Sequence, residues 1–476
     1  MKFEKMQILN REEIKRIDKA SIDILENIGF YVPHEEMLSI AHDNGANVDF
    51  KQKVVKVSEA VVRKCIETAG KKFTVFGIDK NKNARFGYGD QNFLSSSSQY
   101  IWIDLISGKR FNPKLDNIRD AIIVADNLSN INIVGQMGVP SDVDVKHKDI
   151  ICFLEQLKYT GKPPYVFVNN GRSAKTIIKM CEAIRGSKEE LVKYPFMETF
   201  VEPISPLRYL RESIEALIEF ASYGMPIGIG PMAMTSSTAP CTIAGTLTVE
   251  NTDILSAVVL SQFINPGTPI NYWGTCHIMD LSTTSISFGS PEQALLGIAL
   301  NQLGDYYGFP VGTNTGLSDA ILPDSQSGVE RGITATLTAL AGSSIFGHVG
   351  ICGPDQGFSI DEMIIEDEMI GYIRRVLKGF EVNDETIALD TIKKVGRNGN
   401  FLVEDHTLKY FKKDIWFPTI YNRFGYDNWV KQQEKTLLEK SRKKMKAILD
   451  KEPKVYLSKE QEKDLKNIAG EYLKEL

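Results

Sequence analysis

A regular alternation of helix-like and strand-like segments runs from about residue 115 to residue 377 and constrains the fold more than any other feature of this sequence. The helix-like segments repeat apolar residues every three to four positions, and most are followed by a short apolar run with few charges. These runs lie at 131–138, 165–168, 196–201, 226–231, 269–274, 310–313 and 344–350. Strands that are apolar throughout are typical of a parallel sheet covered on both faces.

The seven runs and a strand-like segment at 99–106 make eight strands. This count favours the α/β class and a closed (β/α)8 TIM barrel, with an open doubly wound sheet as the alternative. Ser205-Pro206 and Ser290-Pro291 each pair a capping hydroxyl with a proline suited to the first helical turn. Glycines suited to ending a helix stand at Gly224, Gly267 and Gly308.

The segments before and after this alternation predict added helices rather than barrel strands. Residues 1–90 predict a helical extension, in which Asn10 caps a helix that ends near Gly29 and further helices cover 35–44 and 58–69. Residues 91–400 contain the barrel. Residues 401–476 predict added helices, a long charged one at 427–449 and a second at the end of the chain.

Composition narrows the function classes. A formal net charge of -5 offers no basic face for nucleic acid. The six cysteines stand singly, which indicates reduced thiols rather than a disulfide frame. The first residues lack the apolar segment of a secretory signal, and no uncharged apolar run reaches the length of a membrane span. We therefore expect a soluble cytoplasmic protein that binds neither nucleic acid nor membrane.

No lysine occurs between Lys193 and Lys378, although both ends of the chain are rich in lysine. We interpret this stretch as one with little free solvent surface, either buried in the barrel or covered by partner chains. It also supplies no lysine for Schiff-base chemistry at the strand ends, so only Lys158 or Lys162 could serve an aldolase-type reaction.

Metal and nucleophile motifs are weak. A zinc site built from Cys276, His277, His348 and Cys352 is conceivable, but the spacing is not diagnostic, and we expect no metal. The sequence contains no GxSxG elbow and no glycine-rich phosphate loop that leads into a helix.

In a (β/α)8 barrel the site lies where the strands end. The strand ends carry aromatic, amide and thioether side chains and few charges; Glu202, Ser205, Met232, Met234, His277 and Asp319 are among them. A quaternary ammonium cannot donate a hydrogen bond, so a site selects it with aromatic faces, each contributing about 0.5–2 kcal/mol. Tyr272 and Trp273 are the preferred pair. The full set of expected substrate-binding residues is Tyr100, Trp102, Tyr272, Trp273, Thr313, Asn314, Phe346, His348, Gln356 and Phe358.

Several segments together resemble the trimethylamine methyltransferase family. The main one is Gly230-Pro231-Met232-Ala233-Met234-Thr235-Ser236-Ser237-Thr238-Ala239-Pro240, continued by Thr242-Ile243-Ala244-Gly245. Others are Ser107-Gly108-Lys109-Arg110, Ile131-Asn132-Ile133-Val134-Gly135, Pro266-Gly267-Thr268-Pro269, Ser290-Pro291-Glu292, and Asp319 with Asp324-Ser325-Gln326-Ser327-Gly328. The likeness extends from the first helix to about Leu377.

The resemblance implies a (β/α)8 barrel, a homo-oligomer, and methyl transfer from an amine to the cobalt of a corrinoid held by a partner protein. Founding members of the family contain pyrrolysine and use trimethylamine. This chain consists of standard residues and has Ile321 where a lysine is common. It therefore looks like the branch without pyrrolysine, whose substrates are betaines such as glycine betaine, proline betaine or carnitine.

A quaternary amine is already an activated methyl donor, so we assign no catalytic residue and expect catalysis by positioning. The resemblance implies no cofactor bound tightly by this chain, because the corrinoid belongs to the partner. Candidate donors to a betaine carboxylate are Arg208, Thr313, Asn314, His348 and Gln356, with His348 preferred. Two alternatives remain: a non-catalytic betaine-binding barrel, and a barrel enzyme that acts on a different small substrate.

Overall fold

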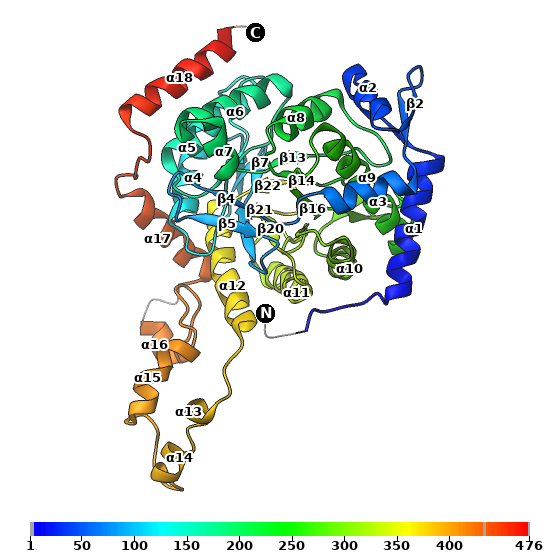
Figure 1. The fold of residues 1–476 in the computed structure, drawn as a ribbon. Helices are drawn as coiled ribbons and strands as arrows, with labels where there is room; N and C mark the ends of the chain where they lie inside the picture. Colours follow the sequence, from blue (N-terminus) through cyan, green and yellow to red (C-terminus); the bar gives the residue numbers. More distant parts are fainter. Residues whose placement is uncertain (1–3, 432–434, 475–476) are drawn as a thin grey trace.

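The computed structural model describes residues 4–431 and 435–474 (Figure 1). Within them, eight short strands form a curled parallel sheet: β6 (Asn92–Ser95), β10 (Val134–Gly135), β12 (Pro164–Tyr165), β13 (Thr199–Val201), β14 (Ile227–Ile229), β16 (Ile270–Gly274), β19 (Val311–Thr313) and β20 (Ile345–Val349). β13, β14, β16, β19, β20 and β6 pair side by side, β10 pairs with β12, and a parallel bridge from Leu94 to Ile133 connects the two groups. The predicted (β/α)8 barrel is confirmed.

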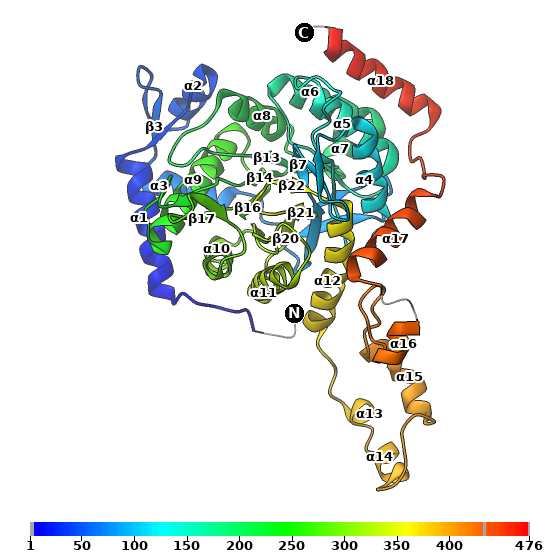
Figure 2. The ribbon, with the colours of Figure 1, turned by 180° about the vertical axis from the view of Figure 1, so that it is seen from behind.

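A ring of helices surrounds these strands (Figures 1 and 2). The ring consists of α4 (Leu115–Asn127), α5 (Lys148–Tyr159), α6 (Gly171–Arg185), α8 (Arg211–Ser222), α9 (Ile243–Ile264), α10 (Pro291–Tyr307), α11 (Ser325–Ala341) and α12 (Ile360–Lys378), with the short α7 (Lys188–Lys193) after α6. As the sequence predicts, α10 begins with Pro291 after Ser290 at the N-cap position, and Gly308 ends it in the left-handed conformation. The Ser290 hydroxyl, however, makes no capping hydrogen bond.

The first barrel strand differs from the prediction. It is β6 rather than the segment at 99–106, because residues 92–95 are buried on both faces, as an inner strand must be. The later segment forms a hairpin of β8 (Trp102–Asp104) and β9 (Lys109–Phe111). This hairpin joins β21 (Ile351–Cys352) and β22 (Gly357–Phe358) in a separate four-stranded sheet.

A second difference concerns Ser205-Pro206, which does not begin α8. The helix starts at Arg211, and the preceding loop is held instead by Asp253 of α9. Ser205 Oγ donates to one oxygen of that carboxylate at 2.7 Å, and the Leu207 N–H donates to the other at 2.8 Å. The prediction of a helix start at Ser205-Pro206 is therefore wrong, because a tertiary acceptor keeps the serine in the loop.

The N-terminal extension contains α1 (Arg11–Asn27), α2 (Glu35–Asp43) and α3 (Glu59–Thr68) and a small sheet of β1 (Phe30–Tyr31), β2 (Asn47–Asp49) and β3 (Val54–Lys56). Asn10 and Glu13 form a capping box at the start of α1. The extension packs on α9, which is the one helix among the described residues long and apolar enough to cross a membrane; 72% of its apolar window is buried inside the fold.

The opposite ends of the barrel are built differently. At the N-terminal end of the strands, a hairpin of β4 (Phe73–Phe76) and β5 (Asn83–Phe86) lies across the barrel, where the Phe76 N–H donates to Pro195 just before β13. At the C-terminal end, which we call the mouth, short pairs extend the strands: β7 (Ser97–Gln99) with β11 (Met137–Gly138), and β15 (Met234–Thr235) and β18 (Ser285–Ser287) with β17 (His277–Asp280).

The C-terminal region leaves the barrel and then returns to it. After α12 come α13 (Asp384–Ile387), α14 (Leu389–Val395), α15 (Asp405–Asp414) and α16 (Tyr426–Lys431), which extend away from the body (Figures 1 and 2). α17 (Leu437–Leu449) and α18 (Lys459–Lys474) then pack along the outside of the helical ring. The helix expected over 427–449 corresponds to α16 and α17, and residues 432–434 between them lie outside the described residues.

The barrel interior packs around one large side chain. Trp273 of β16 is almost fully buried and packs against Phe200 and the plug formed by Phe73 and Phe86. Glycines of neighbouring strands make room for its ring: a Cβ at Gly312 would lie 2.5 Å from Trp273 Cδ2, and one at Gly347 would lie 3.1 Å from Cζ3. The tryptophan and the glycines are therefore one packing unit.

We predict that Gly312→Ala destabilises the protein by about 1–3 kcal/mol, because the added methyl group overlaps the indole in a closed barrel. Gly470→Ala on α18 is the control, since nothing lies within 4 Å of its Cβ position. Thermal denaturation of both variants measures the difference. Equal melting temperatures for wild type and Gly312→Ala would show that the interior can relax around the indole.

Candidate functional site

A small cavity of about 130 Å³ lies at the barrel mouth. It is lined by Ser98, Gln99, Phe167, Phe200, Glu202, Met232, Thr275, Phe288, Asn314, Leu317, His348, Ile351 and Asp355. Most of these residues stand at or just after the end of a barrel strand or its short extension. This is the position at which (β/α)8 barrels build their sites.

Three aromatic rings line the cavity. Phe167 and Phe200 meet edge to face, with ring centroids 5.4 Å apart, and Phe200 meets Trp273 below it in the same way at 5.8 Å. Phe288 contributes a third ring, 5.3 Å from the imidazole of His277. Aromatic faces with negative quadrupoles suit a cation that carries methyl groups.

The charged residues that line the cavity are acidic. Glu202 and Asp355 both border the cavity, and the described lining residues include no lysine or arginine. Burial raises the pKa of Glu202, and the nearby negative charge of Asp355 raises it further. Gln99 Nε2 donates to Asp355 at 2.7 Å, which fixes that carboxylate at the rim. The electrostatics therefore favour a positively charged ligand.

His348 enters the cavity through an unusual backbone conformation. Two positions earlier, Phe346 faces outward and stacks on Phe93 with centroids 4.8 Å apart, so strict alternation would turn His348 outward as well. His348 instead has φ +71°, and the pairing of β20 with β6 shifts register between Phe346 and Val349. Burial lowers the pKa of His348, although Asp355 opposes this effect, so its imidazole is neutral near pH 7. A strained non-glycine residue in a barrel mouth indicates a functional constraint.

Of the ten residues expected from the sequence, the structure places Asn314 and His348 on the cavity wall. Thr313 faces the helical layer, where its hydroxyl contacts those of Thr315 and Ser343 at 3.0 and 3.1 Å. Gln356 is exposed beside Asp355, which takes the lining position instead.

The expected aromatic residues need correction, because none of the six is among the described lining residues of the cavity. Tyr272 points into the layer between barrel and helices and donates to Asn251 of α9 at 3.0 Å. Trp273 points inward but lies beneath Phe200 rather than on the cavity wall. Phe346 faces outward, as described above. Trp102 and Phe358 pack on each other with ring centroids 5.2 Å apart, and Tyr100 is 60% exposed.

Sequence reasoning placed Glu202 and Met232 at strand ends but gave them no role, and it missed Phe167, Phe200, Phe288 and Asp355. A usable signal existed for two of the rings. Phe167 and Phe200 stand near the ends of their predicted strands, and Phe200 lies two residues before Glu202, on the same face of an extended segment. No local pattern marks Phe288 or Asp355, which come from loops.

Buried carboxylates from the outer helices hold the mouth loops in place. Glu250 of α9 accepts hydrogen bonds from the backbone N–H groups of Ala233, Thr275 and Cys276 at 3.0, 2.7 and 2.9 Å. Burial raises the pKa of Glu250, and the three amides oppose this by stabilising its ionised form. One side chain thus fixes the loops that present Met232 and Thr275 to the cavity.

A buried ion cluster does the same on the other side of the mouth. Arg331 of α11 pairs with Glu362 and Glu366 of α12 at 3.0 and 2.9 Å, and it also donates to the carbonyls of Gly316 and Ile351. Glu366 in turn accepts from the Gly350 N–H at 3.1 Å. The loops around Leu317 and His348 are therefore tied to one network. Removing one partner of such a cluster leaves buried charge uncompensated.

The geometry gives no support to the zinc alternative. The described residues contain no group of three or more His, Cys, Asp or Glu side chains that could hold a metal ion. His277 lies 3.2 Å from the carbonyl of Thr275, and burial raises the pKa of the Cys276 and Cys352 thiols.

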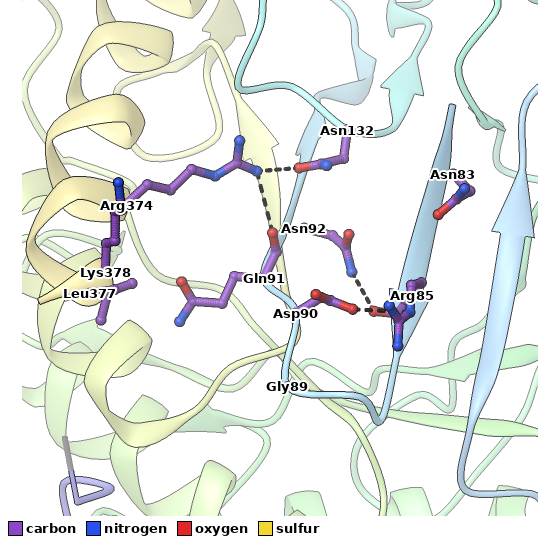
Figure 3. A pocket seen from close by; sticks show the side chains of 10 residues that line it. All are labelled: Asn83, Arg85, Gly89, Asp90, Gln91, Asn92, Asn132, Arg374, Leu377 and Lys378. Atoms are coloured by element: carbon purple, nitrogen blue, oxygen red, sulfur yellow. Dashed lines mark hydrogen bonds and ion pairs between the residues drawn. The ribbon is translucent and has the colours of Figure 1, made fainter. Parts of the chain in front are cut away.

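A second cavity, of about 500 Å³, lies at the N-terminal end of the strands (Figure 3). Its cationic groups are already engaged: Arg85 pairs with Asp90 at 3.3 Å, and Arg374 donates to Asn132 and to the Gln91 carbonyl. These contacts brace α12 against the start of β6. No aromatic residue is among its described lining residues, so this cavity has no counterpart to the rings of the mouth cavity.

The family model for trimethylamine methyltransferase (MTTB) matches residues 1–471. The chain belongs to the trimethylamine methyltransferase family. Among curated members it is 29% identical to the trimethylamine methyltransferase MttB of Desulfitobacterium hafniense (strain DSM 10664 / DCB-2), over 92% of this chain and 88% of that protein. It is 28% identical to the glycine betaine methyltransferase of Desulfitobacterium hafniense (strain Y51), over 91% and 90%.

A solved structure, that of the hydroxylamine complex of MtmB, shares the fold. The two chains superpose with a TM-score of 0.50 at 11% identity, and the match covers 92% of each. This family member is therefore a (β/α)8-barrel methyltransferase, and its candidate active site is the cavity at the mouth.

Glu198 lies in the barrel interior next to Trp273 and gives a pH-dependent prediction. Its Oε1 accepts from Trp273 Nε1 and Asn271 Nδ2 at 2.9 and 3.1 Å, and burial raises its pKa to about 7. Because a folded-state pKa above the unfolded value means that folding takes up a proton, stability is lost as the pH rises from about 4.5 through 7. The loss amounts to about 3 kcal/mol.

Glu198→Gln should reduce this pH dependence, since the amide cannot ionise. The measurement is chemical denaturation of wild type and variant between pH 5 and pH 8, values that bracket the transition at about 7. Glu439→Gln on the exposed start of α17 serves as the control. Parallel slopes for wild type and Glu198→Gln would refute the assignment.

Proposed function

We propose that this chain transfers a methyl group from a small quaternary amine of the betaine class to the Co(I) of a corrinoid carried by a partner protein. The observation that carries the proposal is the mouth cavity, with three phenylalanine rings, two carboxylates and, among its described lining residues, no cationic side chain. A quaternary ammonium is held by aromatic faces and by nearby negative charge rather than by hydrogen bonds. A relative that covers 91% of the chain is named a glycine betaine methyltransferase, which agrees with this substrate class.

The chemistry asks little of the protein beyond position. The N–CH3 bond breaks with its electron pair left on nitrogen, so the product is a neutral tertiary amine. The electron pair of Co(I) forms the new Co–CH3 bond, and cobalt becomes formally Co(III). No proton moves, so no acid or base is required. The contribution of the cavity is to orient one methyl group toward the open mouth and to exclude water, which is catalysis by proximity.

A betaine also carries a carboxylate, and the cavity offers neutral donors for it. His348 and Asn314 both line the cavity, and a neutral imidazole donates without bringing a buried full charge. We assign the carboxylate to these two side chains.

The acidic lining favours a second candidate substrate, a quaternary amine without a carboxylate. Glu202 and Asp355 would attract such a cation throughout, whereas they repel the carboxylate of a betaine. The two candidates share the chemistry and the partner and differ only in the group attached to the ammonium.

An assay with cob(I)alamin separates the candidates. We expect methylcobalamin to form with glycine betaine, proline betaine or carnitine, and not with trimethylamine, which this cavity does not activate. Choline and tetramethylammonium test the second candidate. Binding of a betaine without turnover, even with a cognate corrinoid protein present, would show a binding protein instead of an enzyme. No turnover with any quaternary amine would point to a different methyl donor.

Two variants test the cavity itself. Phe167→Leu should raise the KM for the amine by about 2- to 30-fold, the equivalent of one lost cation–π contact, with a smaller effect on kcat. Phe346→Leu, which alters an outward-facing ring, should leave KM unchanged. An unchanged KM for Phe167→Leu would remove that ring from the site.

Glu202→Gln distinguishes the substrate classes directly. Removing the carboxylate relieves repulsion of a betaine, so kcat/KM for a betaine should rise or stay constant. For a quaternary amine without a carboxylate, the same variant should lower kcat/KM, because it removes an attractive charge. Steady-state rates with one substrate of each class provide the comparison.

A further inference from the structure

Phe288 lies in a short segment between β18 and α10, and its ring is one of the three that line the mouth cavity. The ring is 2% exposed and packs with Leu317 and Ile351, which line the same cavity. An aromatic ring attracts a cation only while its face is held toward the charge. Because residues 288–290 have no regular structure, another part of the chain must hold this ring in place.

Asp319, in the loop after β19, makes the hydrogen bonds that hold the segment. One of its carboxylate oxygens accepts from the N–H groups of Phe288 and Gly289 at 2.7 and 3.2 Å. The other oxygen accepts from the hydroxyl of Ser287. Hydrogen bonds to a carboxylate are shorter and stronger than those between neutral groups. Asp319 therefore fixes the chain before, at and after Phe288.

Asp319 itself borders a different cavity. It is not among the described lining residues of the mouth cavity. Together with Asp280 it lines a cavity of about 800 Å³ beside the β17–β18 hairpin. Any effect of Asp319 on a ligand in the mouth cavity must therefore pass through Phe288 or act by charge at a distance.

The position of Asp319 is set by α11. Glu330 of this helix accepts from the Asp319 N–H at 2.9 Å and from the Ser318 hydroxyl at 2.6 Å. Gly289 packs on the same carboxylate, since a Cβ at this position would overlap Glu330 Oε2. α11 packs beside α10 in the ring of helices (Figures 1 and 2). The helices thus fix the loop after β19, and this loop fixes Phe288.

We propose that Asp319 is a positioning residue, which holds the Phe288 ring against the ammonium group of the substrate and so sets the affinity for the amine. This inference rests on the proposed function, because it requires a quaternary ammonium in the mouth cavity. Phe288 makes the contact, and Asp319 determines its geometry. A contact that is present equally in the ground state and the transition state affects KM and leaves kcat unchanged.

Steady-state kinetics with the amine and cob(I)alamin test the proposal. Asp319→Ala should raise the KM for the amine by about 2- to 30-fold, the equivalent of one lost cation–π contact, and should change kcat less. Asp319→Asn should keep a KM near the wild-type value, because its amide oxygen can still accept from the Phe288 N–H and its NH2 group can donate to the Ser287 hydroxyl. An equal rise of KM in both variants would show that Asp319 acts by charge at a distance, and this would overturn the proposal.

A double-mutant cycle tests whether the effect passes through Phe288. Phe288→Leu should raise KM by itself, and adding Asp319→Ala should raise it little further, since the ring is already absent. Two effects that multiply independently would contradict the proposal. Asp280→Ala is the control: its carboxylate borders the same 800 Å³ cavity but accepts from Ser282 at the tip of the hairpin, so KM should not change.

Hydrogen exchange gives a readout that does not depend on turnover. Amides of the segment 287–289 should be protected in wild type and in Asp319→Asn, and should exchange faster in Asp319→Ala. Equal protection in all three proteins would overturn the role of Asp319.

Gly289→Ala provides a second variant in case Asp319→Ala does not fold, which circular dichroism shows. It displaces the same segment from Glu330 without removing a charge and should also raise KM. An unchanged KM in the folded variants of Asp319→Ala and Gly289→Ala overturns the proposal. If wild type itself neither binds nor demethylates any quaternary amine, the proposed function fails, and this inference fails with it.

Discussion

The mouth of this barrel depends on one interaction, the hydrogen bond from a loop backbone N–H to a buried carboxylate of an outer helix. Glu250 holds two loops through three amides, and Asp253 holds the loop after β13. Glu366 holds the loop after β20. Each bond satisfies a buried donor that would otherwise cost free energy, and each fixes a segment that carries lining residues. The rigid helical ring thereby transmits its geometry to loops that contain little regular structure.

These hydrogen bonds help to explain why the stretch between Lys193 and Lys378 contains no lysine. Between Lys193 and Lys378 the chain has nineteen aspartates and glutamates against five arginines. The structure shows that several of these carboxylates have backbone amides or Arg331 as partners, not lysines. These acidic groups are buried, but the stretch as a whole is not, since Leu281 and Leu322 are more than half exposed. On the outer face of α11, where the same stretch also reaches the surface, it is apolar and uncharged.

The barrel could be predicted from the sequence because helices with apolar residues every three to four positions alternate with short apolar strands. This pattern remains recognisable even where single segments are irregular. The site residues could not be predicted in the same way, because a barrel strand of three residues has two faces. Periodicity does not tell which of these faces points into the barrel. Tyr272 and Trp273 are adjacent, so they could never share a cavity, yet both attracted attention as aromatic residues at a strand end. His348 lies on the cavity wall only because its backbone leaves the strand conformation, and nothing in the residues beside it announces that turn.

The plug at the N-terminal end of the barrel has a consequence for the order of events. Phe73 and Phe86 of the β4–β5 hairpin, together with Trp273, fill the base of the barrel, so the cavity is a blind chamber that opens at the mouth. A blind chamber has a single opening. Under the proposed function, the amine and the methyl acceptor would share that opening, so the amine would have to enter before the acceptor docks. The demethylated amine would leave only after the acceptor has departed, which would make the kinetic sequence compulsory rather than random.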